Sequence, residues 1–372
     1  MILTIILFLV VLAMLVFVHE LGHFIVAKMC GVRVDEFCVG FPPRILSWGK
    51  GGTKYSIGAI PFGGFVKIFG EDGVTEEADG LLRQELPRKD GKGKSFVNVS
   101  KWKQVAILLS GILFNLIFAW ILISSSFAVG LISSVDSEYK NVATNISTIV
   151  LSVMKNSPAE KAGITIGDRI SSISNGTESF TVPTLAEVQK VVKDSVSSVK
   201  IIYERSGKQT ELDIIPDISG GVRVIGIGMD TVGIIKFGIL RSFYEGGKTT
   251  IITSGKVIVG IYDLIKNAIV GKADFSQVTG PVGIAEMVGQ AKYFGLSYFL
   301  GFIALISINL GMINLVPFPA LDGGRVLFVA IEGITRKNIK PIIANILNTI
   351  GFGLLILLMI VLTFKDIGRL IK

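Results

Sequence analysis

The sequence predicts a multi-pass α-helical membrane protein with four transmembrane helices, and two observations support this fold class. Half of the 372 residues are hydrophobic and the mean hydropathy is positive, which is unusual for a soluble protein of this length. Four nearly uncharged stretches reach about 20 residues or more, the length that crosses a bilayer: residues 3–27, 104–130, 297–316 and 343–364.

The first stretch could be confused with a signal peptide. It has no basic segment before it and no small-residue cleavage site, so we expect the mature protein to retain it.

Charge and cysteine content argue against two other classes of protein. The formal net charge is +8, but the Lys and Arg residues are spread through loops, without a basic stripe or interleaved aromatic residues. We therefore expect no nucleic-acid partner. Cys30 and Cys38 are the only cysteines, which is too few for a disulfide framework, and we interpret them as thiols on a reducing side of the membrane.

The loops between the four stretches predict an orientation. Loop 28–103 carries thirteen Lys or Arg residues, and loop 317–342 carries four more. Positively charged loops near span ends stay in the cytoplasm. We therefore expect both loops in the cytoplasm, and the N-terminus, residues 131–296 and the C-terminal tail outside.

Residues 1–130 are predicted to form the N-terminal half of a membrane core, and residues 294–372 its C-terminal half. The first half of loop 28–103 is strand-like, with glycine and proline between the strands. After Glu71, and through Lys94, the sequence becomes charged and glycine-rich, which predicts a mobile surface loop.

The segment between the two halves predicts an α+β domain followed by helices. Residues 131–236 contain a strand-like stretch, an amphipathic helix and a hairpin, with a core at 145–218. In residues 237–293 apolar residues recur at helical spacing, but Lys256, Asp263 and Lys266 interrupt them. These charges favour interfacial amphipathic helices over a fifth span.

The end of the first stretch contains a HExxH motif. His19 and His23 are four residues apart, so on a helix both imidazoles can reach one Zn²⁺ ion. Glu20 can serve as general base for a water molecule on that ion. The alternative is two packed histidines beside a stray carboxylate. An ionisable residue inside a spanning segment is functional by default, and the protein has no other histidine, so we favour the metal site.

Asp322 is the predicted third zinc ligand. Alternating spans place the end of the third stretch on the same side of the membrane as the end of the first, and Asp322 is the one acid at that depth. Pro317 and Pro319 break the helix there, which lets irregular backbone approach the metal. The alternative role for Asp322 is that of N-cap of the following helix.

The two motifs, HELGH and NLVPFPALDGG, are similar to those of the site-2 protease family of intramembrane zinc metalloproteases. The resemblance is to the bacterial branch that includes the regulator of sigma-E protease, and it runs from Leu3 to about Phe364. It implies Zn²⁺ bound by His19, His23 and Asp322, with Glu20 as the catalytic base. It also implies that Asn314 and Pro317 line the substrate cleft.

Two further segments resemble parts of the family. GITIGDRI is similar to a phrase of its extracytoplasmic PDZ domain, so residues 131–236 are expected to be PDZ-like, with a role in binding peptides or in excluding large substrates. YSIGAIPFGGFVKIFGE resembles its membrane-associated β-hairpin, which implies that Gly58, Gly63 and Gly64 contact substrate. A purely structural sheet is the alternative. Asn115 in the second stretch is expected either to hydrogen-bond across helices or to serve in packing.

The resemblance implies an enzyme of the bacterial cytoplasmic (inner) membrane, with its active site toward the cytoplasm and the PDZ-like domain outside. Its expected partners are the lipid bilayer and single-pass membrane substrates such as anti-sigma factors or signal-peptide remnants, already trimmed by an upstream site-1-type protease. Two other functions compete with this one: a catalytically silent PDZ-bearing membrane scaffold, and a metal or proton transporter. The transporter is disfavoured because no inverted repeat and no further intramembrane acids or histidines are evident.

Overall fold

The computed structural model describes residues 2–71, 94–135, 139–205, 207–272, 278–337 and 339–371. The predicted mobile loop after Glu71 lies mostly outside these residues. The chain divides into two compact units: a first unit of Met1–Ile123, Gly246–Gly289 and Phe302–Lys372, and a second unit of Ser124–Glu245 and Gln290–Gly301.

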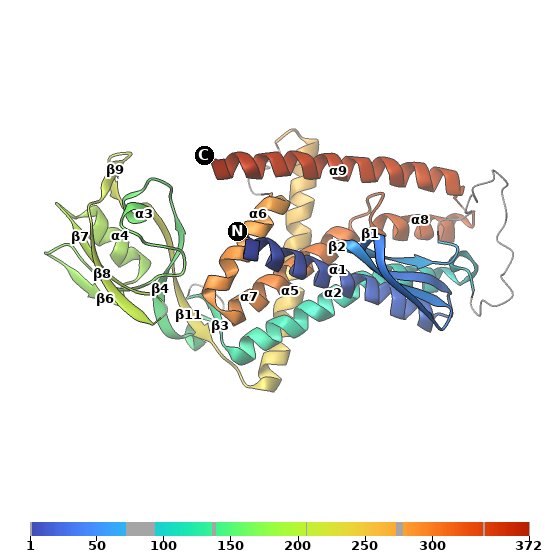
Figure 1. Cartoon of the computed structure of the whole chain (residues 1–372), viewed down its shortest axis with the longest axis horizontal. Coiled ribbons are helices and arrows are strands. Elements are labelled where there is room, and N and C mark those ends of the chain that lie inside the picture. Colours follow the sequence, from blue (N-terminus) through green and yellow to red (C-terminus); the bar gives the residue numbers. More distant parts are fainter. Residues whose placement is uncertain are drawn as a thin grey trace. The chain divides into compact units, whose positions relative to one another are not determined.

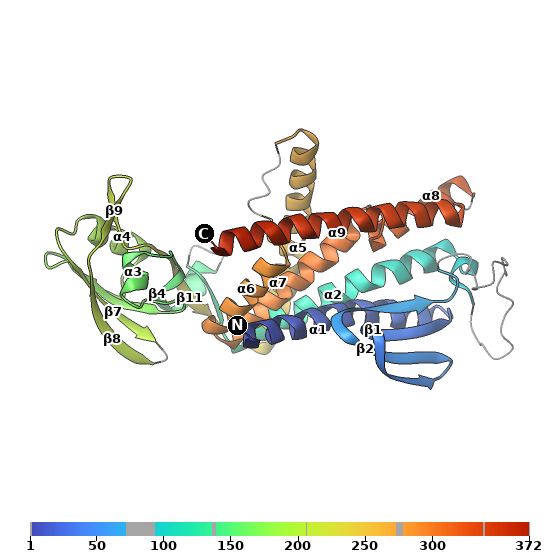
Figure 2. The same cartoon turned by 45° about the horizontal axis from the view of Figure 1, so that its top comes forward.

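The long helices contain four candidate membrane spans, as the sequence predicts: Leu3–Met29, Lys101–Val129, Leu296–Leu315 and Pro341–Arg369. They belong to α1 (Ile2–Met29), α2 (Lys101–Val129), α7 (Leu296–Leu315) and α9 (Pro341–Ile371). The other helices that follow the second unit's sheet in sequence are α5 (Ile239–Ile269), α6 (Pro281–Ala291) and α8 (Asp322–Thr335). Figures 1 and 2 show α1 and α2 side by side.

Helix α9 is longer than the apolar stretch that predicts it. Pro341 starts the helix, where its missing N–H is not needed. At the other end Asp366 is buried and accepts a hydrogen bond from the Gly283 backbone N–H at 2.8 Å, while Lys365 Nζ donates to the Val278 carbonyl. These partners allow charged residues to continue a helix that hydropathy alone would end near Phe364.

The strand-like loop of the first unit forms two long antiparallel strands, β1 (Val34–Lys50) and β2 (Thr53–Ile68). Both strands bend back, so that residues 36–39 pair with residues 54–57 on one side and with residues 64–67 on the other. Residues 64–68 are therefore an outer strand, and no pairing along their other side occurs within the described part of the chain. The sheet lies along the C-terminal half of α1 (Figures 1 and 2).

The second unit is built around a seven-stranded sheet in the order β3-β11-β4-β5-β7-β8, with β6 beside β5. Its strands are β3 (Leu131–Ser134), β4 (Thr144–Val153), β5 (Arg169–Ser174), β6 (Ser179–Thr181), β7 (Val199–Arg205), β8 (Lys208–Ile214) and β11 (Ile227–Ile235). A small hairpin joins β9 (Asp217–Ser219) and β10 (Val222–Val224), and α3 (Pro158–Lys161) follows β4.

The predicted amphipathic helix of this unit is α4 (Leu185–Lys193). It begins at a capping box, in which the Thr184 hydroxyl accepts from the Glu187 N–H and the Glu187 carboxylate accepts from the Thr184 N–H. Its apolar side, with Val188 and Val191, packs into a core with β-strand residues such as Ile173. The predicted strand and hairpin are likewise present, as β4 and β7–β8.

Candidate metal centre

The two histidines of the motif lie one turn apart on α1. Their Nε2 atoms are 3.2 Å apart, and both side chains are buried. His23 Nδ1 is 2.8 Å from the Ile107 carbonyl oxygen on α2, which can only accept. The Nδ1 atom therefore carries the proton, and the Nε2 atom keeps a lone pair for a metal ion.

Two glycines allow α2 to approach the histidines. A Cβ atom on Gly22 would lie 2.5 Å from the Ser110 carbonyl oxygen, and one on Gly111 would lie 2.4 Å from His23 Nε2 and 2.7 Å from His19 Cε1. Any larger side chain at either position would push the helices apart or displace an imidazole. Gly111 is thus part of the wall that confines the imidazoles.

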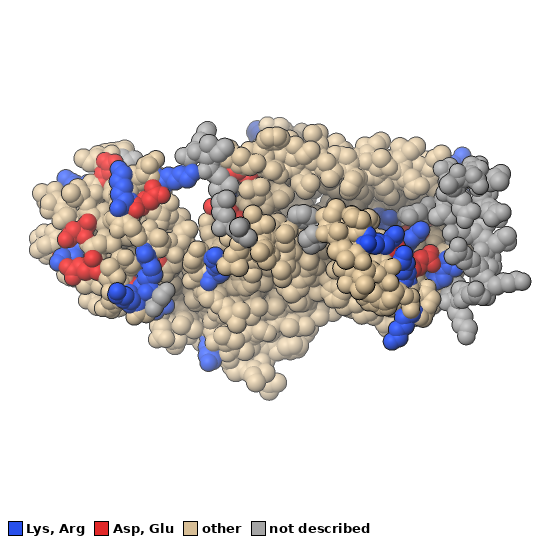
Figure 3. All heavy atoms as spheres, in the orientation of Figure 1, with Lys and Arg blue, Asp and Glu red and all other residues tan. Residues whose placement is uncertain are grey.

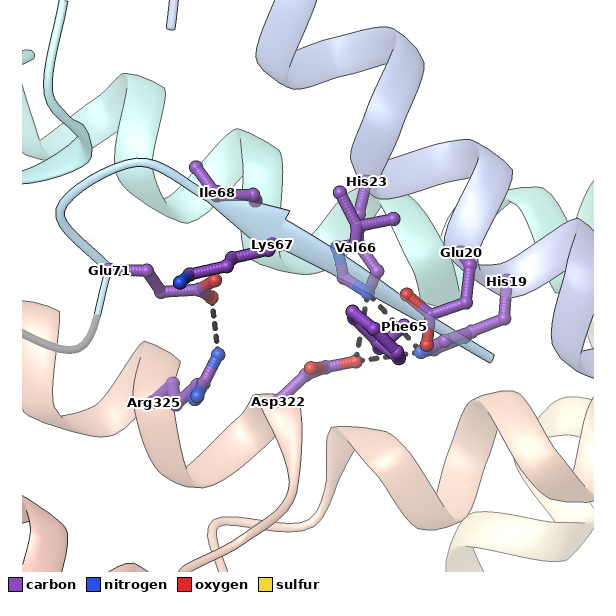
Figure 4. Close-up of a pocket in the computed structure, with 10 residues that line it drawn as sticks. All are labelled: His19, Glu20, His23, Phe65, Val66, Lys67, Ile68, Glu71, Asp322 and Arg325. Atoms are coloured by element: carbon purple, nitrogen blue, oxygen red, sulfur yellow. Dashed lines mark hydrogen bonds and ion pairs between the residues drawn. The ribbon is translucent and has the colours of Figure 1, made fainter. Parts of the chain in front are cut away.

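The third predicted ligand reaches the histidines from α8, three hundred residues away in sequence. Asp322 Oδ2 is 3.0 Å from His19 Nε2 and 3.3 Å from His23 Nε2. Asp322 is the first residue of α8, whose N-cap is Leu321, and no side chain caps this helix. The capping alternative for Asp322 is therefore wrong, because the Asp322 carboxylate points toward the histidines (Figure 4).

The separations of these three atoms fit a shared zinc ion. With zinc–ligand bonds of about 2.0–2.1 Å, tetrahedral geometry places ligand atoms about 3.3–3.4 Å apart. The observed separations run from 3.0 to 3.3 Å. His19, His23 and Asp322 are also the group that could hold a metal ion among the described residues.

Asn115 of α2 lies against the other side of His19. Its Nδ2 is 3.2 Å from His19 Nδ1, and its buried Oδ1 has no hydrogen-bond partner within the described residues. Rotating the amide by 180° exchanges these two atoms, and Oδ1 then accepts a hydrogen bond from the His19 Nδ1–H group. That arrangement leaves the lone pair on His19 Nε2, facing the metal position. Of the two predicted roles for Asn115, the cross-helix hydrogen bond is the one observed.

A cavity of about 390 Å³ opens beside the three ligand atoms. Figure 4 shows its lining: the Glu20 carboxylate points into the same space as the histidines, residues 65–68 of the outer strand form one wall, and an ion pair joins Glu71 to Arg325. The cavity thus holds a general-base candidate, a metal-ligand set and a strand edge together.

The five residues predicted to contact substrate are distributed unevenly. Gly64 begins the outer strand, and a Cβ atom there would lie 3.7 Å from Glu20 Cγ. Gly58 instead packs against the Phe41 carbonyl oxygen, and Gly63, at φ +111°, packs against the Phe41 ring, so both have a structural explanation. Asn314 lies in the last turn of α7 and Pro317 follows this helix, and neither lines the cavity.

Sequence reasoning missed three contributors to this site: Gly111, Glu71 and Arg325. Arg325 lies three residues after Asp322, so helical spacing could have placed it on the same face. No local signal connects Glu71 to α8, because the two segments meet only through the tertiary fold.

Comparison with known proteins agrees with the chemistry of the site. The model of the family described as Peptidase family M50 matches residues 7–358. A Rhizobium meliloti protein with the provisional name zinc metalloprotease is 30% identical, over 98% of this chain and 96% of its own length. A Clostridium acetobutylicum protein with the same provisional name is 33% identical, over 95% of this chain and 94% of its own. The zinc metalloprotease RasP of Oceanobacillus iheyensis is 28% identical, over 99% of each chain. These names agree with the zinc predicted from the sequence.

Proposed function

The chain belongs to peptidase family M50, and we propose that it is an intramembrane zinc metalloprotease that hydrolyses peptide bonds in or near transmembrane segments of other membrane proteins. One observation carries this proposal. The ligand atoms of His19, His23 and Asp322 converge beside the carboxylate of Glu20, and Glu20 lies in a helix long and apolar enough to span a membrane. Neither a scaffold nor a transporter requires a general base beside such a ligand set.

The chain's own residues divide the work of hydrolysis. His19, His23 and Asp322 would hold the metal, beside the cavity. A bound zinc ion would supply a Lewis acid that polarises the scissile carbonyl and makes a water molecule more acidic. The Glu20 carboxylate takes the proton from the attacking water and passes it to the leaving amine.

The outer strand provides a binding surface for an extended substrate. Residues 65–68 line the cavity, and the backbone of an extended peptide can pair with the edge of this strand that has no partner among the described residues. A substrate helix must unwind to do so, so residues of low helix propensity near the cut are expected to speed cleavage. The arm formed by residues 41–60 exposes Phe41, Ile45 and Trp48, which suits a membrane-associated hairpin.

Partners and topology complete the proposal. We place the enzyme in the bacterial inner membrane as a four-span protein, with the active site toward the cytoplasm and α5 at the membrane interface. Its substrates are single-pass proteins, such as anti-sigma factors or signal-peptide remnants, that an upstream protease has trimmed. The second unit, as a PDZ-like domain outside the membrane, acts as a gate on substrate size. Its compact sheet, with the capped helix α4 in the core, supports a separate globular role.

The test is cleavage of a single-span model protein by the purified chain in liposomes. We expect cleavage inside or beside the span, its loss when a chelator removes the metal, and its recovery with one equivalent of Zn²⁺. Tight zinc binding without cleavage of any single-span substrate would favour the scaffold. Zinc uptake into the liposomes in place of cleavage would favour the transporter.

A further inference from the structure

Helix α8 presents a single face to the N-terminal half of the chain. Along this face are Asp322, Arg325, Val326, Val329 and Glu332, at positions i, i+3, i+4, i+7 and i+10. Every one of these side chains has a partner in the N-terminal half of the chain.

The partners are polar at both ends of the helix and apolar in its middle. Asp322 meets the histidines, and Arg325 forms an ion pair with Glu71, the third residue after β2 (Figure 4). Val329 is buried, and Val326 packs beside it, in an apolar cluster shared with Ala27, Val34, Ile68, Phe96 and Ile107. At the far end Glu332 Oε2 accepts from Lys101 Nζ, the first residue of α2, at 2.6 Å.

The first turn of α8 packs through Gly323 and Gly324 against the backbone of residues 315–319, but the rest of its opposite side is largely exposed. Leu327, Ile331 and Ile334 are 42%, 40% and 84% exposed. The apolar cluster alone does not define the position of α8 along its axis, because apolar contacts are non-directional and tolerate sliding. The ion pair between Arg325 Nη1 and Glu71 Oε1 is directional, and it therefore favours one position of α8 along its axis.

The Arg325–Glu71 pair is placed where such a constraint acts on the metal centre. Arg325 is one helical turn from Asp322, and Glu71 is 12% exposed in the wall of the same cavity. Glu71 also follows the outer strand that lines this cavity. The pair therefore ties the segment that would seat a substrate to the helix that carries the third ligand.

We propose that Arg325 and Glu71 are positioning residues, whose ion pair holds α8 in the register that brings Asp322 Oδ2 onto the two histidine Nε2 atoms. Lys101 and Glu332 anchor the other end of the same helix. This inference rests on the proposed metal site, and it assigns a function to two charged residues that the hydrolysis steps leave unused.

The proposal is tested by the affinity for metal, measured by competition with a chromogenic chelator, and by the visible absorption spectrum of the Co²⁺-loaded protein. Arg325→Gln and Glu71→Gln are each expected to weaken Zn²⁺ binding about 10–100-fold, as loss of outer-shell support does elsewhere. Each should also change the Co²⁺ spectrum. The double variant should be no worse than either single variant, because both remove the same ion pair.

A charge swap separates positioning from direct contact with substrate. Glu71→Arg combined with Arg325→Glu rebuilds the pair in reverse, and we expect it to recover most of the zinc affinity and cleavage. Recovery of zinc affinity without cleavage would support the positioning role and would mean that the Arg325 cation also acts on the substrate. Arg325→Lys keeps the charge but loses the guanidinium fork, and should give an intermediate zinc affinity.

The control is a matched ion pair that belongs to the second unit. Lys200 and Glu211 form an exposed ion pair on β7 and β8, and Lys200→Gln should leave zinc affinity unchanged. If Arg325→Gln folds, as judged by helical circular dichroism, and binds zinc as tightly as the parent chain, the positioning role is wrong. If the parent chain itself binds no zinc, the proposed function is what fails.

Discussion

The two units of this protein place their apolar residues in opposite ways. In the second unit Ile170, Ile173, Val191 and Ile201 are almost completely buried in one core. In α9 of the first unit only 11% of the most apolar 18-residue stretch is buried, and side chains such as Phe352 and Leu357 are more than half exposed. Figure 3 agrees, with charged side chains scattered over the strands of the second unit and an almost uncharged surface over the middle of α9.

The difference indicates which solvent each unit needs. A helix surface that is apolar all around is stable only in lipid or inside a larger protein, whereas a buried Ile/Val core with a charged exterior suits water. The ligand set, the general-base candidate and the cavity all belong to the first unit. The comparison therefore places the candidate chemistry in the membrane-type unit, and the proposed role of the water-type unit in selecting substrate is a separate hypothesis.

The largest expected effect comes from Glu20 in the first unit. Glu20→Gln should lower the cleavage rate about 10²–10⁴-fold, because an amide cannot take a proton from water. Zinc content measured by elemental analysis should not change, since both imidazoles and Asp322 remain. Glu211→Gln, an exposed carboxylate of the second unit, is the matched control and should cleave at the parent rate. Substantial turnover by the purified Glu20→Gln protein would contradict the assignment of the base.

Asp322→Ala should weaken zinc binding by more than the roughly 10–100-fold that loss of an outer-shell partner causes, because two histidines leave the metal under-coordinated. Cleavage should fall with occupancy. Asp366→Ala is the control, because Asp366 is another buried acid of the first unit but supports the start of α6. Unchanged zinc stoichiometry in Asp322→Ala would remove Asp322 from the ligand set.

Replacing residues 145–218 with a short Gly/Ser linker tests whether the second unit selects substrate without taking part in bond cleavage. We expect the variant to cleave a trimmed substrate at nearly the parent rate and to cleave the untrimmed, full-length form faster than the parent does. The readout is the ratio of the two rates in the same liposomes. Loss of both activities with zinc and helical content intact would mean that the second unit helps to build the active site.

The smallest effects concern stability. Ile173→Ala should destabilise the second unit by about 2–5 kcal/mol, as large-to-small changes in packed cores do. Leu357→Ala, on the exposed side of α9, should change stability by no more than about 0.5 kcal/mol. Hydrogen exchange of the β4 and β5 amides would report the first change, and zinc affinity should be the same in both variants. A weaker zinc site in Ile173→Ala would show that the two units are energetically coupled.

The membrane spans and the two histidine ligands could be predicted because the sequence patterns that indicate them are local. Uninterrupted hydropathy predicts the four spans, and the spacing of His19 and His23 on one helix face predicts two ligands. The prediction of Asp322 as a ligand also required the alternation of spans across a membrane, because the residues around Asp322 are equally compatible with the start of a helix.

The strand register and the contacts between distant segments were decided only by the tertiary structure. The bending of β1 and β2 that makes residues 64–68 an outer strand depends on register, which glycine-rich strands such as these specify only weakly. Likewise Gly111 against the imidazoles, Asn115 on His19 and Glu71 on Arg325 join segments that no sequence period relates. Helix periodicity determines which side chains share a face, whereas the partner of that face is determined by close packing between elements distant in the chain.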